Sequence, residues 1–135
     1  MKLRVGFAGA LALCASAPAM AAPDAQRGEA LYSRCLACHA LAHDRVGPRH
    51  CGLLGRRAGS LPAYDYSPAM KKSQIVWDAR TLDRFLAKPL AMVPGSTMTY
   101  DGVSDAQDRA DLIAYLARAN QSTECRQRSP RPPSR

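Results

Sequence analysis

Two thiols and an imidazole lie close together in the first third of the chain. Cys35 and Cys38 are separated by two residues, and His39 follows directly. Two thiols one helical turn apart can add to the two vinyl groups of one porphyrin, while the adjacent imidazole reaches the iron. Because C-x-x-C-H is the attachment signature of c-type haem, the sequence predicts one covalently bound haem, with His39 as an axial ligand of its iron.

The same cysteine pair has three other interpretations. A redox disulfide of the thioredoxin type needs a strand followed by a helix, and the chain shows no strand with clear alternation. A structural zinc site needs a second ligand pair, which His43 and His50 do not supply at a standard spacing. A simple structural disulfide leaves the thin core predicted for this chain unexplained. Covalent haem is therefore the favoured hypothesis.

The second axial ligand of the iron must come from elsewhere in the chain. Electron-transfer haems of this type use methionine or histidine, and the available residues are Met70, Met92, Met98, His43 and His50. Met98 ends the segment Val-Pro-Gly-Ser-Thr-Met, in which proline and glycine can shape a rigid loop that returns the thioether to the iron. Met70 and Met92 are expected to pack as flexible apolar filler. The sequence therefore favours Met98.

Two helices are predicted near the ends of the mature chain. Residues 25–40 have a helical pattern, with Asp24 as a plausible N-cap and the two cysteines near one face. The second helix begins with the capping box that Ser104 opens, and an apolar stripe continues to about residue 119. Helical spacing thus explains how both thiols can face one porphyrin.

Two shorter helices are predicted between them. Ser67 followed by proline indicates an N-cap and a first helical position, for a helix that reaches Lys72. Asp78 can cap another helix, which ends at Lys88 because Pro89 disfavours a helical residue before it.

The remaining chain is a long irregular segment over residues 43–66. Loops beyond about 12 to 15 residues are uncommon in compact domains and often functional. Four helices that cover about half of the chain also make a thin core, so another group is expected to fill the centre. The predicted fold class is all-α, with about four to five short helices and long loops wrapped around one covalently bound haem.

Length and the N-terminal residues set the domain organisation. The chain has 135 residues, 47% of them hydrophobic and 22% charged, which is typical of one soluble globular domain. Lys2 and Arg4 precede an apolar run from Val5 to Ala17, and the small-residue site Ala-Met-Ala follows it and ends at Ala21, which is the pattern of a secretory signal peptide. The run is too short to span a membrane stably. We expect cleavage near Ala21, export to the periplasm and a monohaem domain over residues 22–120.

The positive charge of the chain is concentrated at its C-terminus. The sequence has 19 Lys and Arg against 11 Asp and Glu, and four arginines lie in the Arg/Pro-rich tail over residues 121–135, which also contains Cys125. Without those four arginines the mature body is nearly balanced in charge. Nucleic-acid binding by the fold is not indicated, because it would need basic residues clustered on a folded face.

The chain closely resembles class I c-type cytochromes, especially mitochondrial cytochrome c and the small soluble bacterial cytochromes c. The resemblance covers about residues 25–120 and rests on several motifs in the same order. After the attachment motif these are Gly47-Pro48, Gly52-Leu-Leu-Gly-Arg56, Tyr64-Asp-Tyr-Ser67, Trp77, Thr81-Leu82, Pro89, Pro94-Gly-Ser-Thr-Met98 and Asp111-Leu-Ile-Ala-Tyr-Leu116.

The resemblance implies a set of residues around the haem. The Pro48 carbonyl would accept a hydrogen bond from the far nitrogen of His39 and so orient the iron ligand. Four side chains would surround the haem propionates: Arg56, Tyr66, Ser67 and Trp77. Gly28 and Tyr115 would form the contact at which the first and last helices cross. The chain also departs from many relatives, because Phe85 replaces a tyrosine near the methionine sulfur and Met70 replaces a polar residue.

The function implied is one-electron transfer by a six-coordinate monohaem carrier, with His39 and Met98 on the iron. The expected partners are redox proteins, namely a membrane cytochrome bc complex, a terminal oxidase or a periplasmic dehydrogenase. No nucleic acid and no stable membrane insertion are expected, and the protein would be a monomer and not an enzyme. The alternative is a peroxidase-like haem enzyme or gas sensor in which the methionine is displaceable.

Two further expectations concern features that differ from the family. Cys51 and Cys125 are the remaining thiols, and the family fold implies that they lie close together, so we predict a disulfide between them; two unpaired thiols are the alternative. Relatives surround the exposed haem edge with lysines. Here Arg34 and Arg45 remain, and the other matching positions hold Leu90, Thr97, Ser104 and Asp105. With Tyr100 beside the edge, we expect a smaller and more apolar contact patch.

Overall fold

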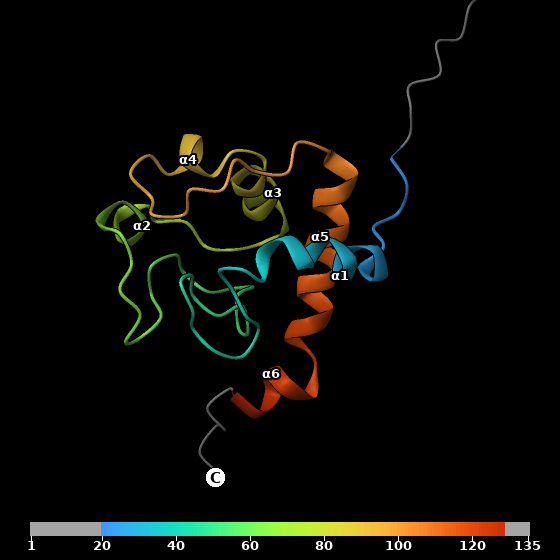
Figure 1. Cartoon of the computed structure of the whole chain (residues 1–135), viewed down its shortest axis with the longest axis horizontal. Helices are drawn as coiled ribbons and strands as arrows, with labels where there is room; N and C mark the ends of the chain where they lie inside the picture. The colour runs from blue at the N-terminus through green and yellow to red at the C-terminus, as the bar shows by residue number, and fades with distance from the viewer. Residues whose placement is uncertain (1–19, 129–135) are drawn as a thin grey trace, which may run out of the picture.

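The computed structural model describes residues 20–128 (Figure 1). Most of the predicted signal peptide and the last seven residues of the predicted tail lie outside this range. The helices are α1 Ala25–Tyr32, α2 Pro68–Lys72, α3 Ala79–Ala87, α4 Pro89–Met92, α5 Ala106–Asn120 and α6 Thr123–Arg128. The described part has no strand, and its only bridge pairs Arg57 with Val76. The predicted all-α class is confirmed.

Helix α1 begins where the sequence predicts and ends earlier. The Asp24 carboxylate accepts hydrogen bonds from the Gln26 and Arg27 N–H groups, which makes it the N-cap. The α-helix stops at Tyr32, and a 3-10 turn, Ser33–Cys35, follows it. Beyond that turn the His39 N–H donates to the Cys35 carbonyl at 2.8 Å. The predicted helix over residues 25–40 is therefore wrong in its second half, where tight turns position the cysteines.

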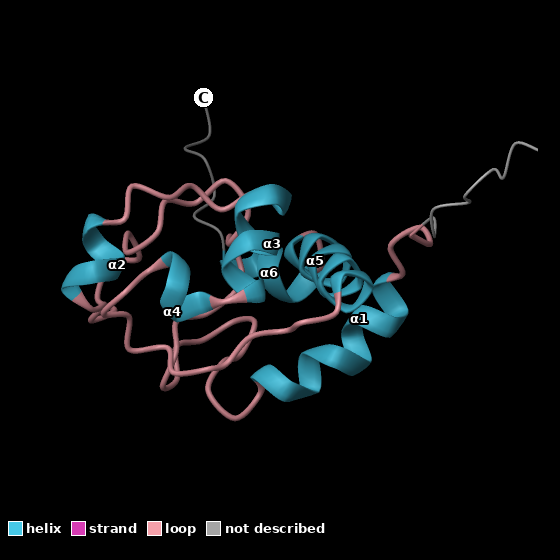
Figure 2. Ribbon diagram, turned by 90° about the horizontal axis from the view of Figure 1, so that it is seen from above, coloured by secondary structure: helices cyan, strands magenta, loops and turns pink. Residues whose placement is uncertain are grey.

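Helices α1 and α5 cross each other on one side of the molecule (Figure 2). A Cβ at Gly28 would collide with the backbone carbonyl of Asp111 and the Cβ of Tyr115, so only glycine permits this close approach. The predicted contact between Gly28 and Tyr115 is therefore present. The N-cap of α5 is Asp105, whose carboxylate accepts from the Asp108 N–H at 2.8 Å. The prediction that Ser104 caps this helix is wrong by one residue.

The two predicted short helices are present, and two others are added. Ser67 caps α2, and Asp78 caps α3 through a reciprocal pair of hydrogen bonds with Thr81. Helix α3 ends at Ala87, and Pro89 then starts the single turn of α4. The segment after residue 120, predicted as a tail, first forms α6. Helix α3 packs against both α4 and α5, whereas α2 lies on the far side of the molecule from α1 and α5 (Figure 1).

A disulfide joins α6 to the irregular segment. Cys51 and Cys125 are bonded, with their Cα atoms 5.0 Å apart, and both are buried. Together with Ala42 they form a small apolar cluster separate from the main core. The predicted pairing is confirmed, and it fixes the end of the folded chain against the loop that follows the C-x-x-C-H motif.

Candidate haem site

A cavity of about 350 Å³ lies between the α1/α5 pair and the opposite side of the molecule. Apolar side chains from α3 and α5, among them Leu82, Phe85 and Leu116, form much of its wall. The cavity is also lined by all nine residues predicted to hold the haem: Cys35, Cys38, His39, Pro48, Arg56, Tyr66, Ser67, Trp77 and Met98. Segments far apart in the sequence are thus brought to one apolar space.

His39 is held in one orientation at the wall of this cavity. Its Nδ1 atom lies 2.7 Å from the Pro48 carbonyl, which is the hydrogen bond that the resemblance implies. Gly47 lies against the same ring, and a Cβ there would overlap the Cε1, Nδ1 and Nε2 atoms of the imidazole. Burial lowers the pKa of His39, and the bond to Pro48 opposes this shift only in part. The ring is therefore neutral at pH 7, with the Nε2 lone pair available to a metal.

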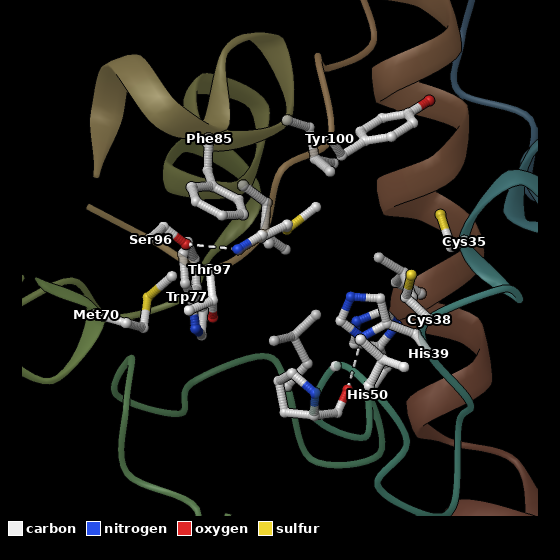
Figure 3. A pocket seen from close by; sticks show the side chains of 18 of the residues that line it. Cys35, Cys38, His39, His50, Met70, Trp77, Phe85, Ser96, Thr97 and Tyr100 are labelled. Atoms are coloured by element: carbon white, nitrogen blue, oxygen red, sulfur yellow. Dashed lines mark hydrogen bonds between the residues drawn. The ribbon is translucent and has the colours of Figure 1, made fainter. Parts of the chain in front are cut away.

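The two motif cysteines carry no disulfide. Cys35 is half-buried and Cys38 is exposed, and both line the cavity beside His39 (Figure 3). Burial is the main cause that raises the pKa of the Cys35 thiol. The part of the chain that the structure describes contains no cluster of three or more His, Cys, Asp or Glu side chains suited to a metal ion. Because Cys35 and Cys38 are not in a disulfide and both line the cavity, their thiols can bond to a group held there.

A half-buried arginine, Arg56, lies in the wall close to His50. Arg56 Nη1 and Nη2 donate to the Cys51 and Arg49 carbonyls, each at 3.0 Å. Its Nε–H is buried with no hydrogen-bond partner among residues 20–128. A buried N–H is costly when unpaired, so an acceptor supplied by a ligand fits here. A haem propionate is an anion of that kind, and Arg56 therefore fits the cofactor that the sequence predicts.

Comparison with known proteins gives one consistent result. Residues 25–120 match the family model described as Cytochrome c. The chain is 44% identical over 118 residues to cytochrome c2 of Rhodomicrobium vannielii, which covers 85% of this chain and 94% of that protein. It is 39% identical over 115 residues to cytochrome c2 of Blastochloris viridis, a match that covers 83% of this chain and 91% of that protein.

A solved structure adds agreement in three dimensions. Cytochrome cH from Methylobacterium extorquens superposes with a TM-score of 0.69 at 41% identity, and covers 70% of this chain and 98% of that one. The chain belongs to the cytochrome c family. As a cytochrome c it carries one haem c, attached covalently through a pair of cysteines.

The cavity narrows the choice of second axial ligand in this cytochrome. Met92 and His43 are absent from the residues that line it, whereas Met70 and Met98 are present. Met70 is buried in the main core cluster, whereas Met98 is only half-buried at the edge of that cluster. Figure 3 shows Met70 beside Trp77, across the cavity from His39. Two methionines therefore line the cavity. The burial of Met70 in the core is consistent with the prediction that Met70 packs as apolar filler.

The predicted propionate residues have their own local roles. The Ser67 hydroxyl accepts from the Met70 N–H at 3.2 Å as the cap of α2, so one of its lone pairs is already used. The Trp77 ring packs 5.0 Å from Phe85, and its backbone N–H donates to the Arg56 carbonyl at 3.0 Å. The rings of Tyr66 and Tyr64 pack edge to face, with their centroids 4.6 Å apart. These contacts hold the wall together around Arg56.

Sequence reasoning missed the role of one cavity residue. The sequence indicates His50 only as a possible ligand, and its ring instead stacks on His39, with centroids 4.3 Å apart and planes 23° apart. Its Nδ1 lies 3.0 Å from the Tyr32 hydroxyl. The position of His50 two residues after Pro48 is a signal that it belongs to the same wall. Its pairing with Tyr32, 18 residues earlier, could not be read from a local pattern.

Proposed function

We propose that this cytochrome is a one-electron carrier between redox proteins, with Cys35 and Cys38 as the attachment residues and His39 and Met98 as the axial ligands. The observation that carries the proposal is the single apolar cavity that brings the C-x-x-C-H motif and Met98 together within residues 20–128. His50 stacks on His39 and so lies on the same side of the site, which leaves a methionine as the opposing ligand.

The chain's own residues support a carrier that changes little between its two redox states. The haem, when bound, supplies a one-electron couple. The bond from His39 to the Pro48 carbonyl and the packing of Gly47 keep the imidazole in place. The apolar walls exclude water, and Arg56 offers a fixed cation to the propionates. A site that is rigid and dry reorganises little on electron transfer.

The proposed setting is the periplasm. It rests on the predicted signal peptide over residues 1–21, followed by the haem domain over residues 22–120 and the basic tail over residues 121–135. Within residues 20–128, no helix combines the length and hydropathy needed to cross a membrane. The proposed partners are a membrane cytochrome bc complex, a terminal oxidase or a periplasmic dehydrogenase, met by a monomeric carrier that catalyses no reaction of its own.

Paired methionine variants test the ligand assignment. Met98→Leu is expected to abolish the weak red charge-transfer band of a ferric iron–methionine bond and to lower the reduction potential, because a thioether stabilises Fe(II). Met70→Leu is the control and should keep the band, since only packing changes. Loss of the band in Met70→Leu alone would show that the wrong methionine was assigned. A wild-type protein that lacks the band and binds carbon monoxide readily would favour the haem enzyme or gas sensor.

A further inference from the structure

His50 lines the cavity, but it has no role in the proposed site as an axial ligand or as a propionate residue. Its ring lies face to face with His39, at 4.3 Å and 23°, and Figure 3 shows the two rings together at one side of the cavity. An in-plane hydrogen bond holds a planar ring at its edge, whereas stacking restrains it at its face. The Pro48 carbonyl holds one edge of His39 at 2.7 Å, whereas His50 covers one face.

The backbone of His50 is anchored from two directions. Its carbonyl accepts a hydrogen bond from Asn120 Nδ2 at 3.2 Å, so the end of α5 holds it. The next residue, Cys51, is fixed by the disulfide to Cys125 in α6. The Cys51 N–H also donates to the Leu41 carbonyl at 2.8 Å. His50 thus lies in a part of the loop that is bonded to α5, to α6 and to the segment after His39.

The His50 ring is anchored as well, by Tyr32 at the end of α1. The Tyr32 hydroxyl lies 3.0 Å from His50 Nδ1, and it has no other hydrogen-bond partner within residues 20–128. Burial, the largest cause, raises the pKa of Tyr32 far above its usual value, so the hydroxyl keeps its proton. The hydroxyl is thus within hydrogen-bond distance of His50 Nδ1, and this contact restrains the rotation of the His50 ring.

We propose that His50, oriented by Tyr32, is a positioning residue that fixes the rotation of the His39 ring about its bond to the iron. The inference rests on the proposed haem ligation by His39. Two restraints act together: the Pro48 carbonyl on the ring edge and the His50 stack on the ring face. The pair Tyr32–His50 thus connects the α1/α5 crossing to the plane of the axial ligand.

Proton NMR of the oxidised holoprotein reads this rotation directly. In a low-spin ferric haem the plane of the axial imidazole sets the pattern of the paramagnetically shifted haem methyl resonances. His50→Leu removes the flat ring and its hydrogen bond, and is expected to shift and reorder these resonances. His50→Phe keeps a flat ring without the Tyr32 bond, so a smaller shift is expected. Tyr32→Phe should resemble His50→Phe.

Tyr115→Phe is the matched control, because Tyr115 packs 5.1 Å from Tyr32 and does not line the cavity. It should leave the methyl pattern unchanged. Methyl patterns of His50→Leu and Tyr32→Phe identical to wild type would overturn the inference, even if both variants were less stable, since a merely structural role predicts that outcome. If His50→Leu does not fold, His50→Phe and Tyr32→Phe decide: haem methyl resonances that move from their wild-type positions support the proposal, and unmoved resonances contradict it.

The wild-type spectrum separates this inference from the proposed function. An upfield methionine methyl resonance is expected from a thioether on the iron. Its absence would contradict the Met98 assignment, whereas its presence together with unmoved haem methyl resonances in the His50 variants would contradict only the positioning role.

Discussion

Gly47 shows how a single residue constrains the iron ligand. A Cβ at this position would overlap the His39 ring. Gly47→Ala should therefore displace the imidazole and weaken its hydrogen bond to Pro48, at an overpacking cost of about 1–3 kcal/mol in the free energy of unfolding. The expected result is a lower yield of haem-loaded protein and an altered ferric spectrum.

Gly52→Ala is the control for this prediction. Gly52 has a φ of 71°, and a Cβ at this position would have no atom within 4 Å, so alanine there strains the backbone without touching His39. It should lower stability and leave the spectrum of the haem unchanged. Equal spectral effects in both variants would show that backbone strain, and not contact with His39, is responsible.

The site residues differ in how far the sequence could predict them. Cys35, Cys38 and His39 form a local pattern with one strong chemical meaning, and Met98 follows a short rigid segment. Arg56 is identified only through the family resemblance, because its partners, the Cys51 and Arg49 carbonyls, depend on the course of the loop. A backbone carbonyl has no sequence signature of its own, so contacts of this kind are predicted only through the family resemblance, as for Pro48 and His39, or are first seen in three dimensions.

At the scale of helices, the α1/α5 crossing depends on a buried carboxylate. The Asp111 side chain is fully buried and accepts from the Asp24 N–H at 2.7 Å and from Gln107 Nε2 at 3.0 Å. It also lies 2.6 Å from Arg27 Nη2. The hydrogen bond from Asp24 is the largest cause that lowers the pKa of Asp111, and the Gln107 bond and Arg27 act in the same direction.

The lowered pKa predicts how stability depends on pH. The unfolded chain binds a proton at Asp111 near its ordinary pKa of 3.8, and the folded protein binds it only at lower pH. The stabilisation is therefore complete above the unfolded pKa and is lost as pH falls from about 4 through the folded value. Asp111→Asn should flatten this acid dependence in urea unfolding experiments. An unchanged acid slope in Asp111→Asn would contradict the role assigned to the carboxylate.

The helix predictions succeeded where a side chain caps its own backbone. Asp24, Ser67 and Asp78 are local signals, and each caps a helix in the structure. The predicted continuation of α1 failed because helical spacing of cysteines does not exclude a 3-10 turn, which keeps similar spacing. Helix α4 has only four residues and α6 only six, too short for a periodic pattern to be seen.

For the whole molecule, the disulfide is the main covalent constraint other than the haem. It joins positions 74 residues apart, and closing a loop of this length contributes about 4–5 kcal/mol in the chain-entropy model, less any strain. The double variant Cys51→Ser/Cys125→Ser should lose a large part of this in the free energy of unfolding. Its red charge-transfer band should persist at low denaturant, because neither cysteine is an iron ligand.

Adding a reductant to the wild type gives the comparison for the double variant. A dithiol reductant should lower the stability of the wild type toward that of the variant and leave the variant itself unchanged. A double variant as stable as the wild type would show that the disulfide does not constrain the unfolded chain as proposed.

The surface charge of the whole molecule predicts weak electrostatic steering. Arg34 lies 3.8 Å from Asp108, and Arg45 donates to the Leu36 carbonyl, so both cations have local partners. Leu36 and Leu90 are exposed apolar residues. Since steered association falls steeply with ionic strength, electron transfer with an acidic redox protein should show only a shallow salt dependence. A steep dependence that survives truncation after Cys125 would place the steering on the folded surface.

Spectroelectrochemical titration of the purified full-length protein tests the central claim most directly. The account predicts one reversible transition with a Nernst slope of one electron, a low-spin haem spectrum in both states and the red iron–methionine band in the oxidised state. A two-electron transition without haem absorbance would indicate a thiol–disulfide couple at Cys35 and Cys38. A one-electron transition with a high-spin ferric state and no red band would contradict a six-coordinate carrier.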